Sequence, residues 1–129
     1  MTPEPVVVTP DTPVAEALAR LRDPDVPPAL AAQVFVCEPP TETPTGLYIG
    51  MVGFQRLLRE PPARHISTCI TETTWVAPDL PELGVAEHLA AYNLIATAVC
   101  DEGPHLVGVV TVDDVLDRVL PAGWRRKEG

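Results

Sequence analysis

Residues 106–116 read Leu106-Val107-Gly108-Val109-Val110-Thr111-Val112-Asp113-Asp114-Val115-Leu116, and this stretch decides the fold. It begins with a valine-rich run that lacks polar alternation, which is typical of a strand covered on both faces. From Val112 onward, apolar residues recur at helical spacing. The stretch therefore predicts a short strand that ends at Thr111 and leads directly into a helix.

The same pattern occurs earlier in the chain, so the sequence contains two copies of one unit. Residues 48–52 and the helical segment after them match this strand and helix, and each copy has a further strand and helix upstream. The matched pairs are 8–13 with 76–81, 33–37 with 96–100, and 48–52 with 106–110. We predict an α/β (α+β) fold of two β-α-β-β-α repeats, with residues 1–66 as repeat 1, 67–121 as repeat 2 and 122–129 as a basic tail.

The two repeats are expected to depend on each other. A unit of about sixty residues buries too little apolar surface to fold alone. We therefore expect the sheets of the two repeats to pack face to face, with the helices outside. Repeat 1 is longer in two places, residues 23–32 and 38–45, where proline-rich polar sequence predicts surface loops.

Composition excludes several classes of protein. The 129 residues carry a formal net charge of −9, which disfavours binding to nucleic acid or to anionic lipid. No apolar run approaches the roughly 18–20 residues of a membrane helix, and no signal-peptide pattern precedes the first repeat. Three cysteines without a CxxC pair, and histidines without ligand spacing, predict neither disulfides nor a metal site. We expect a cytoplasmic protein without direct membrane insertion.

The stretch at 106–116, together with residues 91–95 and 99–103, resembles the second half of a tandem CBS (cystathionine β-synthase) domain pair. Residues 113–117, followed by Leu120-Pro121 and a tryptophan, resemble most closely the CBS pairs of MgtE-type magnesium transporters and their soluble relatives. The resemblance is carried by signature residues over 70–120 and by the repeat over 1–66.

The resemblance implies regulation and not catalysis, so we expect no catalytic residues. CBS pairs usually dimerise, bind an adenosine-type nucleotide or nucleoside, and modulate an attached or partner transporter or enzyme. AMP, ADP, ATP and S-adenosylmethionine, with or without Mg²⁺, are the expected ligands. In the family pattern, Thr111 meets the ligand's phosphate and Asp114 holds the ribose hydroxyls. The alternative is a purely structural module for dimerisation or docking, with degenerate clefts.

The chemistry of these positions agrees with a nucleotide site. Thr111 precedes a helix N-terminus, which attracts a phosphate, and the carboxylate of Asp114 offers two acceptors to a vicinal diol. Adenine needs a flat apolar slot as well. The candidate residues for this slot are Ile70, Trp75, Val76, Leu94, Ile95 and Ala96.

Two further observations bear on this site. Thr111-x-x-Asp114 also fits a capping box, which stabilises a helix start without any ligand. Asp113 and Asp117 add negative charge close to the expected phosphate position, so an anionic ligand needs a compensating cation. This cation is expected from Arg118, Arg64, His65 or a bound Mg²⁺. Without such a cation, an uncharged nucleoside fits the site better than an anionic ligand.

Repeat 1 departs from the pattern of repeat 2. Gly53 stands where Thr111 does, and Arg56 stands where Asp114 does. Because arginine cannot accept a hydrogen bond from a diol, we do not expect a standard nucleoside site there.

Overall fold

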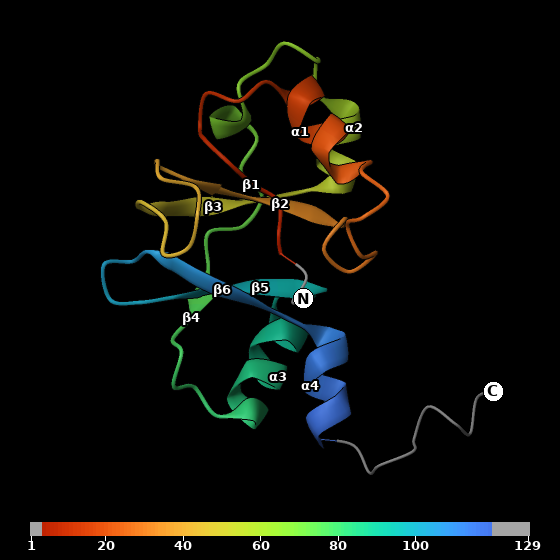
Figure 1. Cartoon of the computed structure of the whole chain (residues 1–129). Helices are drawn as coiled ribbons and strands as arrows, with labels where there is room; N and C mark the ends of the chain where they lie inside the picture. Colours follow the sequence, from red (N-terminus) through yellow and green to blue (C-terminus); the bar gives the residue numbers. More distant parts are fainter. Residues whose placement is uncertain (1–3, 120–129) are drawn as a thin grey trace, which may run out of the picture.

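A computed structural model describes residues 4–119 and shows two three-stranded sheets that face each other, with helices on the outer side of each (Figure 1). This architecture confirms the predicted fold class. Repeat 1 contains β1 (Val7–Val8), α1 (Val14–Leu21), β2 (Gln33–Cys37), β3 (Tyr48–Gly53) and α2 (Phe54–Arg59), followed by the 3-10 turn η1 (Ile66–Thr68). Repeat 2 contains β4 (Trp75–Val76), α3 (Glu82–Ala91), β5 (Ala96–Cys100), β6 (Leu106–Thr111) and α4 (Val112–Val119).

The two sheets have the same strand order, directions and register. In each, the central strand pairs in parallel with the short first strand and antiparallel with the third. The register is irregular at the same point of each pairing, between Val36 and Cys37 in β2 and between Val99 and Cys100 in β5. The matched irregularity shows that both repeats are copies of one unit.

The inner faces of the two sheets form a shared apolar core. Alternate residues of each central strand point into it, as the two-residue period of a strand requires. Its buried members are Val7, Phe35, Cys37, Tyr48 and Met51 from repeat 1, and Ala96, Ala98, Cys100 and Leu106 from repeat 2. The sheet-to-sheet packing that we expected is therefore present, and it joins the repeats into one structure.

Two of the cysteines lie in this shared core. Burial raises the pKa of the Cys37 thiol, and it raises the pKa of Cys100 to about 12. Both side chains therefore stay protonated near neutral pH and act as small apolar residues.

Hydrogen bonds also join the repeats at one end of the sheets. The N–H of Tyr48 donates to the carbonyl oxygen of Pro104 at 3.0 Å, and the N–H of Thr45 donates to the carbonyl oxygen of Leu106 at 3.1 Å. The N–H of Leu106 in turn donates to Oγ1 of Thr45 at 3.0 Å. These bonds fix the start of β6 against the loop that precedes β3.

Asp101 holds the turn that presents the start of β6. Its Oδ1 accepts hydrogen bonds from the backbone N–H of His105 at 2.7 Å and of Gly103 at 2.9 Å. These two bonds lower the pKa of the Asp101 carboxyl below its ordinary value of 3.8. The charged form of Asp101 is therefore the form that the folded state favours.

The lowered pKa predicts a pH-dependent contribution to stability. A depressed folded-state pKa stabilises the fold above the unfolded pKa, and the contribution is lost as pH falls through the folded value. We expect Asp101→Asn to lower the free energy of unfolding near pH 7, and the difference from wild type to vanish in acid. Urea unfolding across this pH range measures the difference. Asp25→Asn, in another exposed turn, is the control; a pH-independent loss for Asp101→Asn contradicts the prediction.

Candidate functional site

An open cleft of about 990 Å³ lies between the repeats, where β6 passes into α4. Its volume is at the upper end of the roughly 300–1,000 Å³ that is usual for small-molecule sites. Both repeats line it. The lining residues are Glu4, Pro5, Val7, Arg20, Pro27, Ala29, Leu30, Thr41, Glu42 and Thr43 from repeat 1, and Val107, Gly108, Val109, Thr111, Asp113 and Asp114 from repeat 2.

The floor of the cleft is β6, and this strand corrects one expectation. We predicted that its valines are covered on both faces, but Val107 is 39% exposed and Val109 is half-buried. A β-carbon added at Gly108 would meet no atom within 4 Å. Among the described residues, no chain segment therefore lies over β6 at Gly108.

Thr111 and Asp114 lie together at one end of this floor. Thr111 is buried at the end of β6, and its Oγ1 accepts a hydrogen bond from the backbone N–H of Asp114 at 3.2 Å. The hydroxyl therefore caps α4, as the capping interpretation requires. Because a hydroxyl also carries a proton to donate, this bond leaves Thr111 able to contact a ligand. Asp114 is exposed in the first turn of α4, on the wall of the same cleft.

The six apolar residues proposed for an adenine slot do not line this cleft. Ile70 packs against the outer core of repeat 1, and Val76 lines a separate cavity of about 140 Å³ beside α3 and α4. Ala96 lies in the shared core between the sheets, with Leu94 packed against it. Trp75 and Ile95 are exposed, and the carbonyl oxygen of Ile95 accepts a hydrogen bond from the N–H of Val112 at 2.8 Å, at the start of α4. None of the six lines the cleft, although Ala96 pairs with Thr111 between β5 and β6. Thr111 and Asp114 both line it.

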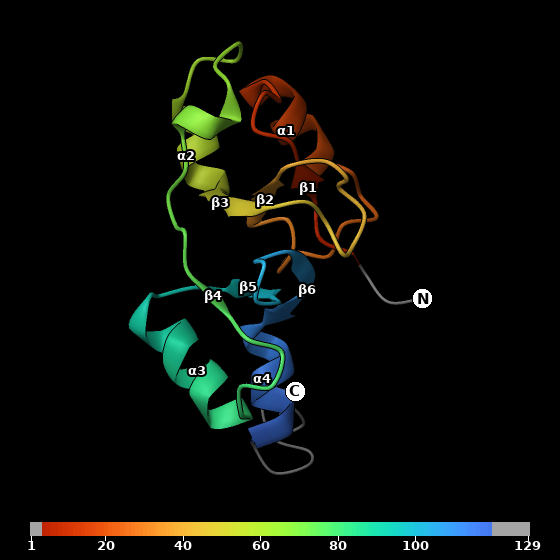
Figure 2. The ribbon, with the colours of Figure 1, turned by 90° about the vertical axis from the view of Figure 1, so that its left-hand side faces the viewer.

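For Ile70, the physical reason is the path of the segment between the repeats. Residues 69–74, which we call the linker, run along β3 of repeat 1 before β4 begins (Figure 2). The N–H of Met51 donates to the carbonyl oxygen of Glu72 at 2.7 Å, and the hydroxyl of Thr71 donates to the carbonyl oxygen of Met51 at 3.0 Å. The linker, which falls within the predicted bounds of repeat 2, thus contacts β3 of repeat 1.

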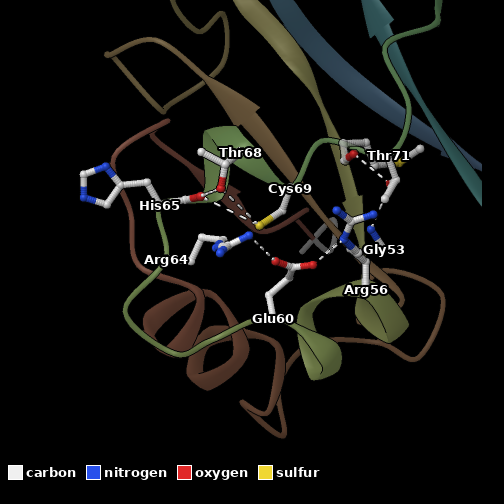
Figure 3. Close-up of polar contacts among 9 residues, drawn as sticks. Gly53, Arg56, Glu60, Arg64, His65, Thr68, Cys69 and Thr71 are labelled. Atoms are coloured by element: carbon white, nitrogen blue, oxygen red, sulfur yellow. Dashed lines mark hydrogen bonds and ion pairs between the residues drawn. The ribbon is translucent and has the colours of Figure 1, made fainter.

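The linker fills the place in repeat 1 that corresponds to the open cleft. A β-carbon at Gly50, the counterpart of Gly108, would lie 2.6 Å from Cγ2 of Ile70 and 2.9 Å from the carbonyl oxygen of Glu72. The N–H of Gly53 donates to Oγ1 of Thr71 at 3.2 Å (Figure 3). Gly53 is the counterpart of Thr111 in repeat 1, and its backbone N–H is therefore already hydrogen-bonded to the linker.

Arg56, at the position of Asp114, is also engaged within repeat 1. Its Nε lies 2.7 Å from Oε2 of Glu60, and Nη1 of Arg64 lies 3.1 Å from Oε1 of the same carboxylate (Figure 3). Repeat 1 thus presents a paired arginine where repeat 2 presents a carboxylate. That repeat 1 has no standard nucleoside site stays a prediction.

The cation that lines the cleft is one that we did not predict. Arg118 lies 3.9 Å from Glu82, beside the smaller cavity, and Arg64 and His65 belong to repeat 1 away from the lining residues. Arg20, in the last turn of α1, lines the cleft instead, and its Nη1 donates to the carbonyl oxygen of Val7. A basic residue near a helix C-terminus is common, so the sequence carries no signal for this role.

Within residues 4–119, no group of three or more histidine, cysteine, aspartate or glutamate side chains is arranged to hold a metal ion. Over the same residues, no helix has the length and apolar character needed to cross a membrane.

The fold and the cleft define the class of protein. The CBS-domain family model matches residues 1–62 and again residues 64–121. The chain therefore belongs to the CBS-domain family, and its two repeats form a CBS pair, the architecture of a regulatory module.

The relatives of this chain include magnesium transporters. Magnesium transporter MgtE of Thermus thermophilus is 30% identical over 118 residues, which cover 91% of this chain and 25% of that protein. The crystal structure of the cytosolic domain of the Mg²⁺ channel MgtE in complex with ATP is 31% identical, with a TM-score of 0.76 over 92% of this chain and 46% of that chain. The chain thus spans about a quarter of the transporter and about half of the cytosolic domain.

A more distant structure shares the fold. The CBS domain of the bacterial CNNM/CorC family Mg²⁺ transporter in complex with ATP is 20% identical, with a TM-score of 0.71 over 93% of this chain and 83% of that chain.

The two glycines provide a test of which cleft is filled. Gly50→Ala places a methyl group against the backbone of Glu72 and is expected to lower the free energy of unfolding by about 1–3 kcal/mol, as overpacking does. The methyl group of Gly108→Ala meets open space, so this substitution is expected to change the free energy of unfolding by less than about 0.5 kcal/mol. Urea denaturation measures both. Equal losses at the two positions would show that the clefts do not differ in this way.

Proposed function

We propose that this chain is a non-catalytic regulatory module that senses an adenosine-type nucleotide or nucleoside in the cleft beside repeat 2. The observation that carries the proposal is the open cleft at the junction of β6 and α4, with Thr111 and Asp114 on its wall. The two relatives whose structures are described as complexes with ATP support the class of ligand.

The chemistry of the cleft assigns a role to each residue. The Asp114 carboxylate accepts two hydrogen bonds from the ribose hydroxyls, and the Thr111 hydroxyl donates to the 5′ side of the ligand. Val107 and Val109 on the floor give the base an apolar surface. The proposal does not need the six apolar residues that do not line this cleft, which are Ile70, Trp75, Val76, Leu94, Ile95 and Ala96.

The output of the module belongs to the same proposal. The names of the relatives favour an attached or partner magnesium transporter, whose activity the bound ligand modulates, with Mg²⁺ as part of the signal. Exposed leucines on the outer helices, Leu58 at 55% and Leu83 at 61%, favour a second candidate function, in which the pair serves to dimerise or to dock.

Calorimetric titration separates the two functions. Adenosine, AMP, ADP, ATP and S-adenosylmethionine are each titrated into the full chain, with and without Mg²⁺. Saturable binding of at least one of them supports the sensor. If none binds, the sensor is excluded, and the structural module remains.

Asp114 provides the decisive variant. Asp114→Ala removes both acceptors for the ribose diol and is expected to weaken adenosine binding by about 1.5–3 kcal/mol, the range for hydrogen bonds to charged groups. Arg56→Ala is the matched control, because Arg56 stands at the same position of repeat 1 and pairs with Glu60. Calorimetry measures both affinities. Equal losses in the two variants would place the ligand elsewhere.

A further inference from the structure

The smaller cavity, of about 140 Å³, lies on the outer side of repeat 2 and shares no lining residue with the open cleft. Its wall is mostly apolar and comes from both helices and all three strands of the repeat. The valines of this wall that come from the strands and from α4 are Val76, Val99, Val110 and Val115.

In repeat 1 the corresponding place is filled by the side chain of Ile66. The counterparts of the four valines belong to one buried core together with Ile66, which lies in η1 and is completely buried. These counterparts are Val8, Val36, Val52 and Leu57. The segment that follows α2 therefore closes the outer core of repeat 1.

A backbone hydrogen bond holds Ile66 over this core. The N–H of Ile66 donates to the carbonyl oxygen of Thr12 at 2.9 Å. Thr12 stands at the position of Leu80, and Leu80 lines the cavity of repeat 2. The place that Ile66 occupies in repeat 1 is thus the place of the cavity in repeat 2.

Among residues 4–119, no segment covers this place in repeat 2. Val36 and Val52 are completely buried, whereas their counterparts Val99 and Val110 are only half-buried. Apolar surface that water still reaches gains free energy when an apolar side chain covers it. The outer core of repeat 2 therefore has room and a driving force for one more large apolar residue.

The sequence supplies such a residue at the matching position. Val115 of α4 stands 58 residues after Leu57 of α2, and Trp124 stands 58 residues after Ile66. The same length of chain therefore leads from α4 to Trp124 as from α2 to Ile66. Residues 120–129, which include the expected basic tail, lie outside the described residues.

We propose that Trp124 docks in this cavity and completes the outer core of repeat 2, as Ile66 completes that of repeat 1. A tryptophan side chain buries about 150–250 Å² of surface, and its indole N–H needs an acceptor when it is buried. The carboxylate of Glu82, which lines the cavity, is an acceptor of this kind. Docking also ties the basic tail to α4, the helix that carries Asp114 at the open cleft.

Fluorescence of the full chain tests whether Trp124 is buried. Trp75→Phe removes the other tryptophan, so the emission then comes from Trp124 alone. We expect this emission to be blue-shifted relative to the urea-unfolded chain, and its quenching by acrylamide to be about threefold weaker, because a docked indole is shielded from water.

A substitution inside the cavity tests where Trp124 docks. In the Trp75→Phe background, Val110→Phe fills the cavity and is expected to shift the emission of Trp124 to the red and to raise its quenching about twofold, because two large side chains overpack the site. Val107→Phe is the matched control, since Val107 lies in the same strand but does not line this cavity. This control is expected to leave emission and quenching unchanged.

A second pair of variants keeps the proposal testable if Val110→Phe does not fold. Trp124→Ala is expected to lower the urea concentration at the unfolding midpoint, because the apolar surface around the cavity loses its cover. Arg126→Ala, in the same tail, is the control and is expected to leave the midpoint unchanged. Circular dichroism during urea unfolding measures both midpoints.

Three outcomes overturn the proposal. Emission and quenching of Trp124 that equal those of the unfolded chain would show that the indole is not docked. Equal responses to Val110→Phe and Val107→Phe, or equal midpoints for Trp124→Ala and Arg126→Ala, would show that Trp124 does not occupy this cavity. Protection of Trp124 that is lost on dilution would assign the cavity to the tail of a second copy of the chain.

Discussion

The packing of the two sheets against each other is the constraint on which the rest of the structure depends. Each repeat buries an outer core against its own helices, but the inner face of each sheet is apolar and has only the other sheet to cover it among the described residues. Phe35 from one repeat and Ala98 from the other meet in this shared core. Because the repeats are similar and face each other, the packing creates two related places where a third strand leads into a helix.

The linker makes these two places different. It lies against β3, where Gly50 leaves just enough room for Ile70 and Glu72, and its Thr71 takes the backbone donor of Gly53. Across the shared core, Gly108 of β6 faces open space. Within residues 4–119, the duplication has thus given an asymmetric module, in which the linker lies over Gly50 and no such segment lies over Gly108.

Local patterns in the sequence predicted the local features of the site. The change from a strand to a helix at Thr111, and the position of Asp114 in the first helical turn, follow from residue spacing alone. The partners across the cleft do not, because Arg20 and Glu42 come from the other repeat and periodicity carries no information about such contacts. The adenine slot was assigned by nearness in sequence to repeat 2, whereas the linker residue Ile70 packs on repeat 1.

The central claim is that the accessible cleft belongs to repeat 2. An NMR titration of the isotope-labelled full chain with adenosine tests it most directly, because each backbone amide reports its own surroundings. We expect shift changes concentrated at the amides of Gly108, Thr111 and Asp114, with those of Gly50 and Gly53 unchanged. Changes of equal size at both sets, or changes confined to Gly50 and Gly53, would contradict the claim.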